Sequence, residues 1–309
     1  MTVVTATAPG KAILFGEHAV VYGQPALAVP VTLVQATASV TAGSDGFWIE
    51  APDLGRRYRL EQAEPVDPLA AAVALVRGRA GVDRLPSAEL RVTSTIPMAA
   101  GLGSGAAVCT ATVRALAAFL GLALSDAEVS ALVFETEKLL HGTPSGIDNS
   151  VIAYGRPVYF VKGQAPVACH VARPFRLVIA DTGRPSPTKI AVGDVRAAYA
   201  REPQRYGRLF AEVGAITQEA RQLIETGAPD RLGPLMTRNH SLLQAMAVSS
   251  PELDDYVARA NAAGAGGSKL SGAGRGGNML ALVTAETEAP VRQALAAAGA
   301  ARVMATTVE

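Results

Sequence analysis

The chain has few cysteines, few aromatic residues and almost no excess of either charge. Two cysteines, Cys109 and Cys169, occur among 309 residues. They stand in apolar contexts and lack the spacing of a metal site or a disulfide framework, which fits a reducing compartment. The 28 basic and 27 acidic residues give a net charge of +1. The chain therefore lacks the electrostatic signature of a protein that binds nucleic acid or an anionic membrane.

Signals for targeting or membrane insertion are also missing from the sequence. Residues 1–10 have neither the basic nor the apolar region of a signal peptide. The run from Gly105 to Leu124 is long enough to span a bilayer, but Arg114 near its centre would cost about 2.5–3.5 kcal/mol on insertion scales. We expect a soluble, cytoplasmic protein whose partner is a small molecule. With 49% hydrophobic residues, the chain can bury a sizeable core, and its length suggests about two domains.

A glycine-rich loop, Ile96-Pro-Met-Ala-Ala-Gly-Leu-Gly-Ser-Gly-Ala-Ala107, stands between a predicted strand and a predicted helix. Residues 89–96 alternate as in a half-buried strand, and residues 106–119 form an Ala/Leu/Val run without Gly or Pro. The glycines let the backbone approach a ligand closely. The free amides at the start of the helix would hold a phosphate. Taken alone, the loop is equally consistent with a turn that binds no ligand.

Two familiar nucleotide motifs are excluded by their surroundings. No lysine has the context of a P-loop, Gly-x-x-x-x-Gly-Lys-Ser/Thr. Gly101-x-Gly103-x-x-Ala106 fits the spacing of the Rossmann fingerprint, but that fold requires a second parallel strand after the helix. Here Ser125-Asp-Ala-Glu128 follows instead, and this capping box starts another helix.

Two acidic residues form the next candidate feature. Residues 125–141 have helical periodicity, and Glu137 lies about 100° from the centre of their apolar stripe. Periodicity alone favours a solvated carboxylate there. The segment His141-Gly-Thr-Pro-Ser-Gly-Ile-Asp-Asn149 reads as a loop that presents polar side chains. Glu137 and Asp148 could approach one another across the helix end, and two carboxylates beside a phosphate loop suit magnesium-dependent phosphoryl transfer.

The N-terminal residues hold a lysine and an acid–histidine pair in apolar surroundings. Residues 2–8 alternate as a strand and run into Pro9-Gly-Lys11, where we expect a turn. Lys11 is either a snorkelling surface residue or a lysine aimed into a site, and the residues alone leave both readings open. Glu17 and His18 favour a functional role, because neither side chain helps the neighbouring apolar segments to become buried.

The second half of the chain combines strands with long helices. We expect strands at residues 175–181, 278–284 and 302–308, and helices at residues 192–200, 206–225, 230–247, 251–263 and 288–298. Thr182-Gly-Arg-Pro-Ser-Pro-Thr-Lys189 is a polar loop that opens a helix. Arg196 shares roughly the helix face of Lys189. It is a candidate for binding a substrate carboxylate, although a surface arginine is slightly favoured.

A second glycine run, Lys269-Leu-Ser-Gly-Ala-Gly-Arg-Gly-Gly277, precedes the strand that begins at Asn278. Gly272-x-Gly274-x-x-Gly277 matches a dinucleotide pattern by count. A dinucleotide loop follows a strand and opens a helix, whereas this run precedes a strand. A second nest of backbone amides is the more economical interpretation.

Three motifs together resemble the GHMP kinase superfamily, named for galactokinase, homoserine, mevalonate and phosphomevalonate kinases. They are Pro9-Gly-Lys11, Ile96-Pro-x-x-x-Gly-Leu-Gly-Ser104 and Lys269-Leu-Ser-Gly-Ala-Gly274, and they span nearly the whole chain in the family's order. Within the superfamily, Gly16-Glu-His-Ala-Val-Val-Tyr-Gly23 and Glu137-Lys-Leu-Leu-His-Gly-Thr-Pro-Ser-Gly-Ile-Asp-Asn149 are similar to the compact prokaryotic mevalonate kinases.

The resemblance implies an α+β, two-domain GHMP kinase fold with the site between the domains. The N-terminal, ATP-binding domain would be of the ribosomal protein S5 domain 2-like type over residues 1–170. The C-terminal domain would be ferredoxin-like over residues 171–309. The implied activity is phosphorylation of the 5-hydroxyl of mevalonate, in the mevalonate pathway of isoprenoid biosynthesis, with ATP and Mg2+ as cofactors. A homodimer is a possible assembly.

The family's functional residues carry over onto matching positions. Asp148 matches the catalytic aspartate, Lys11 the lysine that pairs with it, and Glu137 the magnesium ligand, with Ser104 as a second metal candidate. The nucleotide would be bound by the loop residues Pro97, Ala100, Gly101, Leu102, Gly103, Ser104, Gly105 and Ala106. The substrate-side residues would be Glu17, His18 and Thr188, to which we add Arg196 and the second glycine run's Gly272, Ala273 and Gly274.

Two positions depart from the family, and two alternatives stay open. The family usually reads Gly-Leu-Gly-Ser-Ser, and its metal-contacting serine aligns with Gly105. Arg275 stands where the family commonly has glycine. One alternative is another GHMP kinase, acting on phosphomevalonate, the 3-hydroxyl of mevalonate, homoserine or a sugar. The other is a catalytically silent, ligand-sensing homologue, which would be expected to have lost Lys11, Asp148 or the loop glycines; all are present.

Overall fold

The computed structural model describes residues 3–98, 100–141, 144–186 and 188–309. Residue 2 of the first predicted strand, residues 142–143 of the loop before Asp148, and loop residues 99 and 187 lie outside the described residues. The chain divides into two compact units. Unit 1 comprises residues 1–11, 34–97 and 103–155, and unit 2 comprises residues 12–33, 98–102 and 156–309. The domain boundary expected between residues 170 and 171 stays a prediction.

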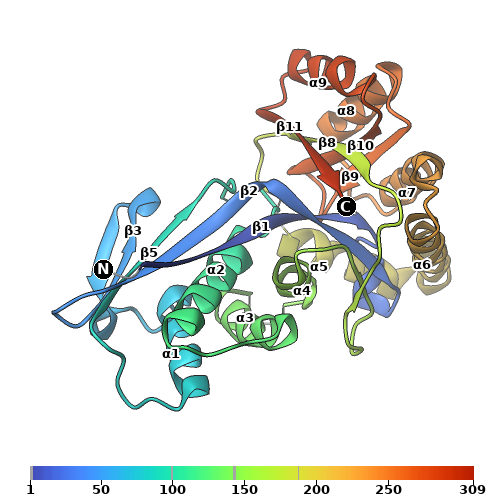
Figure 1. Cartoon of the computed structure of the whole chain (residues 1–309). Helices are drawn as coiled ribbons and strands as arrows, with labels where there is room; N and C mark the ends of the chain where they lie inside the picture. Colours follow the sequence, from blue (N-terminus) through green and yellow to red (C-terminus); the bar gives the residue numbers. More distant parts are fainter. Residues whose placement is uncertain (1–2, 99, 142–143, 187) are drawn as a thin grey trace. The chain divides into compact units, whose positions relative to one another are not determined.

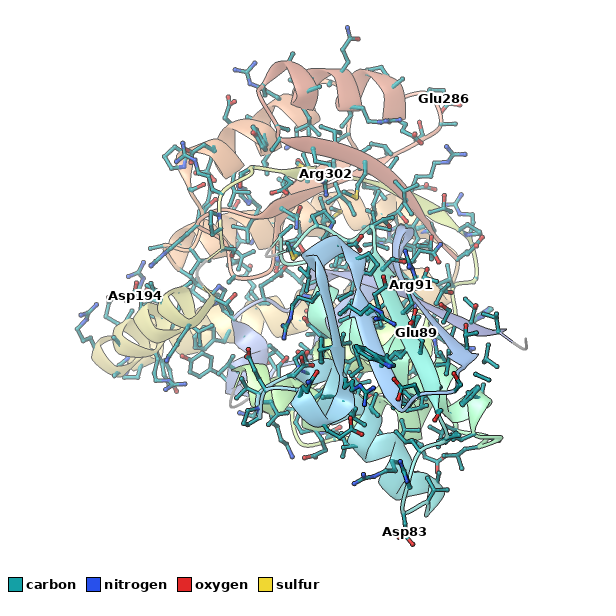
Figure 2. The ribbon with its side chains drawn as sticks, turned by 90° about the vertical axis from the view of Figure 1, so that its left-hand side faces the viewer. Asp83, Glu89, Arg91, Asp194, Glu286 and Arg302 are labelled. Carbon is teal, nitrogen blue, oxygen red and sulfur yellow. The ribbon has the colours of Figure 1, made fainter. Side chains whose placement is uncertain are left out.

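Unit 1 is built on a sheet whose strands alternate between buried and exposed side chains. Its strands are β1 (Val3–Phe15) and β2 (Ala26–Ala42), which both continue into unit 2, with β3 (Phe47–Ala51), β4 (Arg56–Arg59) and β5 (Ala88–Ser94). The order is β4-β3-β5-β2, and β1 pairs with β2. Strand β5 runs antiparallel to β2 and parallel to β3. On β5, Leu90 is buried, while Glu89 and Arg91 lie on the other face, as labelled in Figure 2.

The α-helices described in unit 1 pack together, and capping residues explain where two of them begin. They are α1 (Pro68–Ala80), α2 (Ser104–Phe119), α3 (Asp126–His141) and α4 (Ile147–Tyr154). Helices α1, α2 and α3 pack on one another, with α2 against β5 (Figure 1). Asp67 caps α1 by accepting hydrogen bonds from the N–H groups of Leu69 and Ala70. The predicted capping box before α3 is confirmed: Ser125 N–H donates to Glu128, and Glu128 N–H donates to the Ser125 hydroxyl.

Unit 2 contains a four-stranded antiparallel sheet of the ferredoxin-like type. Its strands are β8 (Phe175–Asp181), β9 (Gly267–Ser271), β10 (Asn278–Val283) and β11 (Arg302–Val308), in the order β11-β8-β10-β9. The three pairings are antiparallel. Helices occur between β8 and β9 and between β10 and β11, which gives the βαββαβ order of this fold. The structure therefore agrees with the predicted C-terminal architecture.

The helices of unit 2 cover this sheet and extend beyond it. They are α5 (Thr188–Arg201), α6 (Pro203–Glu225), α7 (Leu232–Ala245), α8 (Pro251–Ala262) and α9 (Glu288–Ala297). Helices α7 and α8 pack against β9, and α9 packs against β8 and β11 (Figure 1). The 3-10 helix η1 (Ala19–Tyr22) packs against α6, and β6 (Val158–Phe160) pairs with the start of β2. No helix in the described part of the chain is long and apolar enough to cross a bilayer.

Three local predictions are wrong, and tertiary contacts explain the differences. Pro9–Lys11 is not a turn, because β1 continues through it to Phe15; the fixed φ of proline is compatible with an extended chain. Residues 147–149 of the predicted loop belong to α4 (147–154), so Asp148 lies in the first turn of a helix. Glu137 is 4% exposed, whereas periodicity alone favours a solvated carboxylate, and its helix α3 packs against α1, α2 and α4.

Candidate active site

In unit 1, Lys11 and Asp148 lie in direct contact. Lys11 projects from β1 and Asp148 from the first turn of α4, and Lys11 Nζ lies 3.1 Å from Asp148 Oδ1. The lysine side chain is 8% exposed and the aspartate side chain 34% exposed. The ammonium therefore balances the charge of a carboxylate that an incoming hydroxyl can still reach.

Glu137 adds a second carboxylate to the same unit. It is buried on α3, and its pKa is raised to about 7, with burial as the largest cause. The negative charge of Asp148 contributes to this rise, and the positive charge of Lys11 opposes it. The two carboxylates and the lysine therefore interact electrostatically as one group.

The start of helix α2 lies against the same lysine. Gly103 is the N-cap of α2, with a φ of 74°. A Cβ on Gly103 would lie 2.8 Å from Ile152 Cδ1 and 2.9 Å from Lys11 Cγ, so only glycine allows this approach. Ala107 N–H bonds back to the Gly103 carbonyl, and the three N–H groups before it have no acceptor within the helix. These N–H groups, which suit an anion, belong to the predicted nucleotide residues Ser104, Gly105 and Ala106.

The first part of the glycine loop, residues 98–102, belongs to unit 2 and is held there by Asn278. The Asn278 side-chain amide donates a hydrogen bond to the Ala100 carbonyl. Gly101 is exposed with a φ of 76°, and Leu102 is buried. Pro97, the first predicted nucleotide residue, is half-buried in unit 1. The nucleotide roles of these loop residues stay predictions.

In unit 2, Glu17 takes part in a buried ion pair. Glu17 Oε1 pairs with Lys269 Nζ, and these side chains are 1% and 0% exposed. Asn239 Nδ2 donates to Glu17 Oε2 at 3.2 Å, and Lys269 Nζ also donates to the Leu270 carbonyl at 2.6 Å. Burial lowers the pKa of Lys269, and the Glu17 charge opposes this effect. Both Glu17 oxygens therefore have protein partners, and the substrate role of Glu17 stays a prediction.

His18 connects the turn before η1 to the second glycine run. Its backbone has a φ of 59°, and Nε2 donates to the Ala273 carbonyl at 3.0 Å. This contact places the ring proton on Nε2 and leaves Nδ1 as an acceptor. Burial lowers the pKa of His18; the Ala273 bond opposes this shift, and the Arg275 charge adds to it. His18 is therefore neutral near pH 7, beside the predicted substrate residues Gly272, Ala273 and Gly274.

Thr188 and Arg196 both lie exposed on α5. Burial raises the pKa of Tyr22 in η1, and the positive charge of Arg196 opposes this rise. Arg196 therefore lies within electrostatic range of the segment that follows His18. The substrate roles of Thr188 and Arg196 stay predictions.

No site role was expected for three polar side chains of unit 2. Asn239 and Asn278 are buried, and Asp194 on α5 forms an ion pair with Arg275. Asparagine is unfavourable in strands, so Asn278 at the start of a buried strand was the available signal for a fixed hydrogen bond. The signal at Asn239 was a polar residue next to His240 in a helix.

A metal ion would find oxygen ligands in unit 1. Glu137, Asp148 and the Ser104 hydroxyl supply the hard oxygen donors that Mg2+ prefers. Within the residues that the structure describes, no group of three or more His, Cys, Asp or Glu side chains is arranged to hold a metal. A phosphoryl-transfer site does not need one, because magnesium is usually held by one or two carboxylates together with substrate phosphates.

A lysine–aspartate pair beside a helix N-terminus that suits an anion defines a class of protein, the phosphoryl-transfer enzymes. Two family models match this chain: GHMP kinases N terminal domain over residues 68–156, and GHMP kinases C terminal over residues 202–301. Together they cover more than half of the sequence. The chain belongs to the GHMP kinase family, a family of ATP-using kinases, and the predicted two-domain α+β fold is confirmed.

The individual proteins that this chain is similar to include several named mevalonate kinase. The Pyrococcus furiosus mevalonate kinase is 36% identical over 299 residues, which cover 90% of this chain and 89% of that relative. The structure of L. major mevalonate kinase in complex with R-mevalonate matches with a TM-score of 0.83 at 29% identity, over 99% of this chain and 95% of that one. The Methanococcus jannaschii mevalonate kinase matches with a TM-score of 0.86 at 25% identity, over 100% and 99% of the two chains.

Proposed function

We propose that the protein transfers the γ-phosphoryl group of ATP to the 5-hydroxyl of mevalonate and releases 5-phosphomevalonate and ADP. The proposed phosphoryl transfer rests on the 3.1 Å contact between Lys11 and Asp148, next to the start of α2. The assignment of mevalonate as the substrate rests on the similarity to mevalonate kinases over nearly the whole chain.

Asp148 acts as the base in this proposal. Its carboxylate is partly exposed and accepts the proton of the 5-hydroxyl as the oxygen attacks phosphorus. Lys11 holds the carboxylate in place and contributes positive charge where the transferring phosphoryl group gains negative charge. The amides at the start of α2 bind the phosphates of the nucleotide.

Magnesium would be held by Glu137 and, more weakly, by the Ser104 hydroxyl. When bound, the ion neutralises charge on the phosphates of ATP. In unit 2, the His18–Ala273 contact and the turns at Gly272 and Gly274 would hold the substrate, with Glu17, Thr188 and Arg196 as further substrate-side residues. Pro97, Ala100, Gly101, Leu102 and Gly103 would complete the nucleotide loop. A cytoplasmic location and a homodimer complete the proposal.

The test is ADP release from the purified protein in a coupled assay with mevalonate, phosphomevalonate, homoserine and galactose. We expect turnover with mevalonate far above the other three. Phosphorus NMR of the product would then distinguish phosphorylation at the 5-hydroxyl from the 3-hydroxyl. Turnover with a different substrate of the panel would show that the protein is another GHMP kinase. Thermal stabilisation by ATP and mevalonate without any turnover would indicate a silent, ligand-sensing homologue.

A further inference from the structure

Arg275 adopts a backbone conformation that normally requires glycine. Its φ is 58°, between Gly274 at 76° and Gly276 at 148°. The Arg275 N–H donates to the Val248 carbonyl at 2.9 Å, and Ala247, beside that carbonyl, also has a positive φ, of 60°. Such strained positions persist where surrounding contacts fix them, and they occur preferentially at functional sites. The side chain of Arg275 is therefore a candidate for a functional role.

The Arg275 side chain is anchored but still open. Nη1 forms an ion pair with Asp194 on α5, the aspartate labelled in Figure 2, and Nη2 donates to the Ala247 carbonyl at 3.4 Å. The arginine side chain is 30% exposed and the aspartate side chain 56% exposed. A guanidinium has five N–H donors in a rigid plane. The Asp194 contact can therefore orient Arg275 while another edge of the guanidinium receives a second carboxylate.

The surroundings of Arg275 are those of the predicted substrate residues. The Arg275 charge contributes to the lowered pKa of His18, so the two side chains lie within electrostatic range. His18 bonds to Ala273, two residues before Arg275. Ser186, from the segment before α5, donates its hydroxyl to the Gly274 carbonyl at 2.8 Å. The loop that carries Arg275 is therefore fixed from several sides.

Two basic groups close to this loop, Lys269 and His18, are poor candidates for binding a carboxylate. Lys269 has no exposed side-chain surface and is paired with Glu17. His18 is neutral near pH 7, because its pKa lies below the ordinary value of 6.5. A buried or half-buried carboxylate needs a cation or several donors. Arg275 supplies a permanent charge and a planar set of donors.

We propose that Arg275 is the specificity-determining residue of unit 2, which binds the carboxylate of the substrate while Asp194 holds its guanidinium in position. This rests on the proposed function, because mevalonate supplies the carboxylate. A role in binding the carboxylate explains the presence of an arginine at a position where the backbone favours glycine.

The test compares mevalonate with 3-methylpentane-1,3,5-triol, in which an uncharged hydroxymethyl group replaces the carboxylate. In Arg275→Gly, we expect KM for mevalonate to rise roughly 10-fold to 100-fold, as for loss of a charge-assisted hydrogen bond. We expect KM for the triol and for ATP to stay unchanged. Arg275→Lys keeps the charge and should lie between wild type and Arg275→Gly. Glycine suits a φ of 58°, so the thermal midpoint of Arg275→Gly should not fall appreciably.

Asp194→Asn and Arg196→Ala, both on α5, separate the role of Arg275 from the roles of its partner Asp194 and of the other candidate arginine. We expect Asp194→Asn to raise KM for mevalonate by only a few fold, since Arg275 remains. An equal rise in KM for mevalonate and the triol in Arg275→Gly would show that Arg275 only shapes the loop. Loss of discrimination in Arg196→Ala with none in Arg275→Gly would assign the carboxylate to Arg196. Either result would overturn the inference about Arg275. The proposed function would still hold if the wild type turns over mevalonate. If the wild type does not turn over mevalonate, both proposals are wrong.

Discussion

A β-carbon on Gly103 would lie 2.9 Å from Lys11 Cγ, so the glycine loop and the lysine of unit 1 are packed in direct contact. Replacement of Gly103 by alanine must therefore displace Lys11 or the start of α2. A displacement of about 1 Å near a reacting group costs up to roughly 100-fold in rate. We expect Gly103→Ala to lower kcat by more than about tenfold, measured by coupled ADP release.

Gly121→Ala is the matched control for Gly103→Ala. Gly121 has a φ of 71° but no atom within 4 Å of an added Cβ. Both variants carry the strain of a left-handed alanine, about 1–2 kcal/mol, and only Gly103→Ala adds a collision. Equal effects of the two variants on kcat would show that backbone strain, and not the contact with Lys11, is responsible.

The Lys11–Asp148 pair predicts a loss of rate with little loss of nucleotide affinity. We expect Asp148→Asn and Lys11→Met each to lower kcat by at least roughly 100-fold, the usual effect of losing general acid–base assistance. The dissociation constant for ATP, from equilibrium titration, should change far less. Lys138→Met and Asp83→Asn, on exposed residues, should retain the wild-type rate. Wild-type turnover in either site variant would remove that residue from the mechanism.

The oxygen ligands of unit 1 predict an unequal dependence on magnesium. A serine hydroxyl is a weak neutral ligand, and water can replace it in the magnesium shell. Glu137→Gln should therefore raise the magnesium concentration for half-maximal rate much more than Ser104→Ala, and Gly105→Ser should change it only modestly. The measurement is the initial rate against free magnesium at fixed ATP. A larger effect of Ser104→Ala would assign the metal role to Ser104.

His240 predicts a loss of stability at low pH. Leu270 N–H donates to His240 Nδ1 at 3.3 Å, and Nε2 lies 3.1 Å from Asp254 Oδ1. Burial lowers the pKa of His240, Asp254 opposes this and the Lys269 charge adds to it. Because the folded pKa lies below the unfolded value of about 6.5, the unfolded chain binds the proton more readily. The free energy of unfolding should fall as the pH falls below about 6.5, with no contribution from His240 above it.

Urea unfolding at about pH 5 and about pH 7.5 would measure this dependence. His240→Gln should show a smaller difference between the two conditions than the wild type. The pKa of His18 is also lowered, so the same two measurements on His18→Gln compare the contribution of His18 with that of His240. An unchanged difference in His240→Gln would assign the pH dependence to other groups.

The sequence predicts those parts of the fold that local pattern determines. The capping box at Ser125 and Glu128 and the helices with strong periodicity are present as expected. Helix α4 was missed because it has only eight residues and follows a segment rich in Gly and Pro. Glu137 is buried on α3, which packs against α1, α2 and α4, whereas periodicity alone favoured a solvated carboxylate there.

The site was predicted less completely, because its contacts join residues far apart in the chain. The residues alone left Lys11 open between a surface lysine and a site lysine; resemblance paired it with Asp148, and the structure shows that contact. No local pattern links Glu17 to Lys269, or Asp194 to Arg275, because each partner lies on a different element. These pairs depend on tertiary structure, which composition and spacing do not encode.

Because Lys269 is buried, the rate at which its amine is acylated reports on the opening of unit 2. With no exposed side-chain surface, the amine is shielded from acylating reagents until unit 2 opens, whereas Lys189 is exposed on α5 in the native protein. The ratio of the two labelling rates would therefore follow the population of the opened form. Mass spectrometry of the acylated peptides would detect local unfolding in the native protein without an added fluorophore or an engineered cysteine.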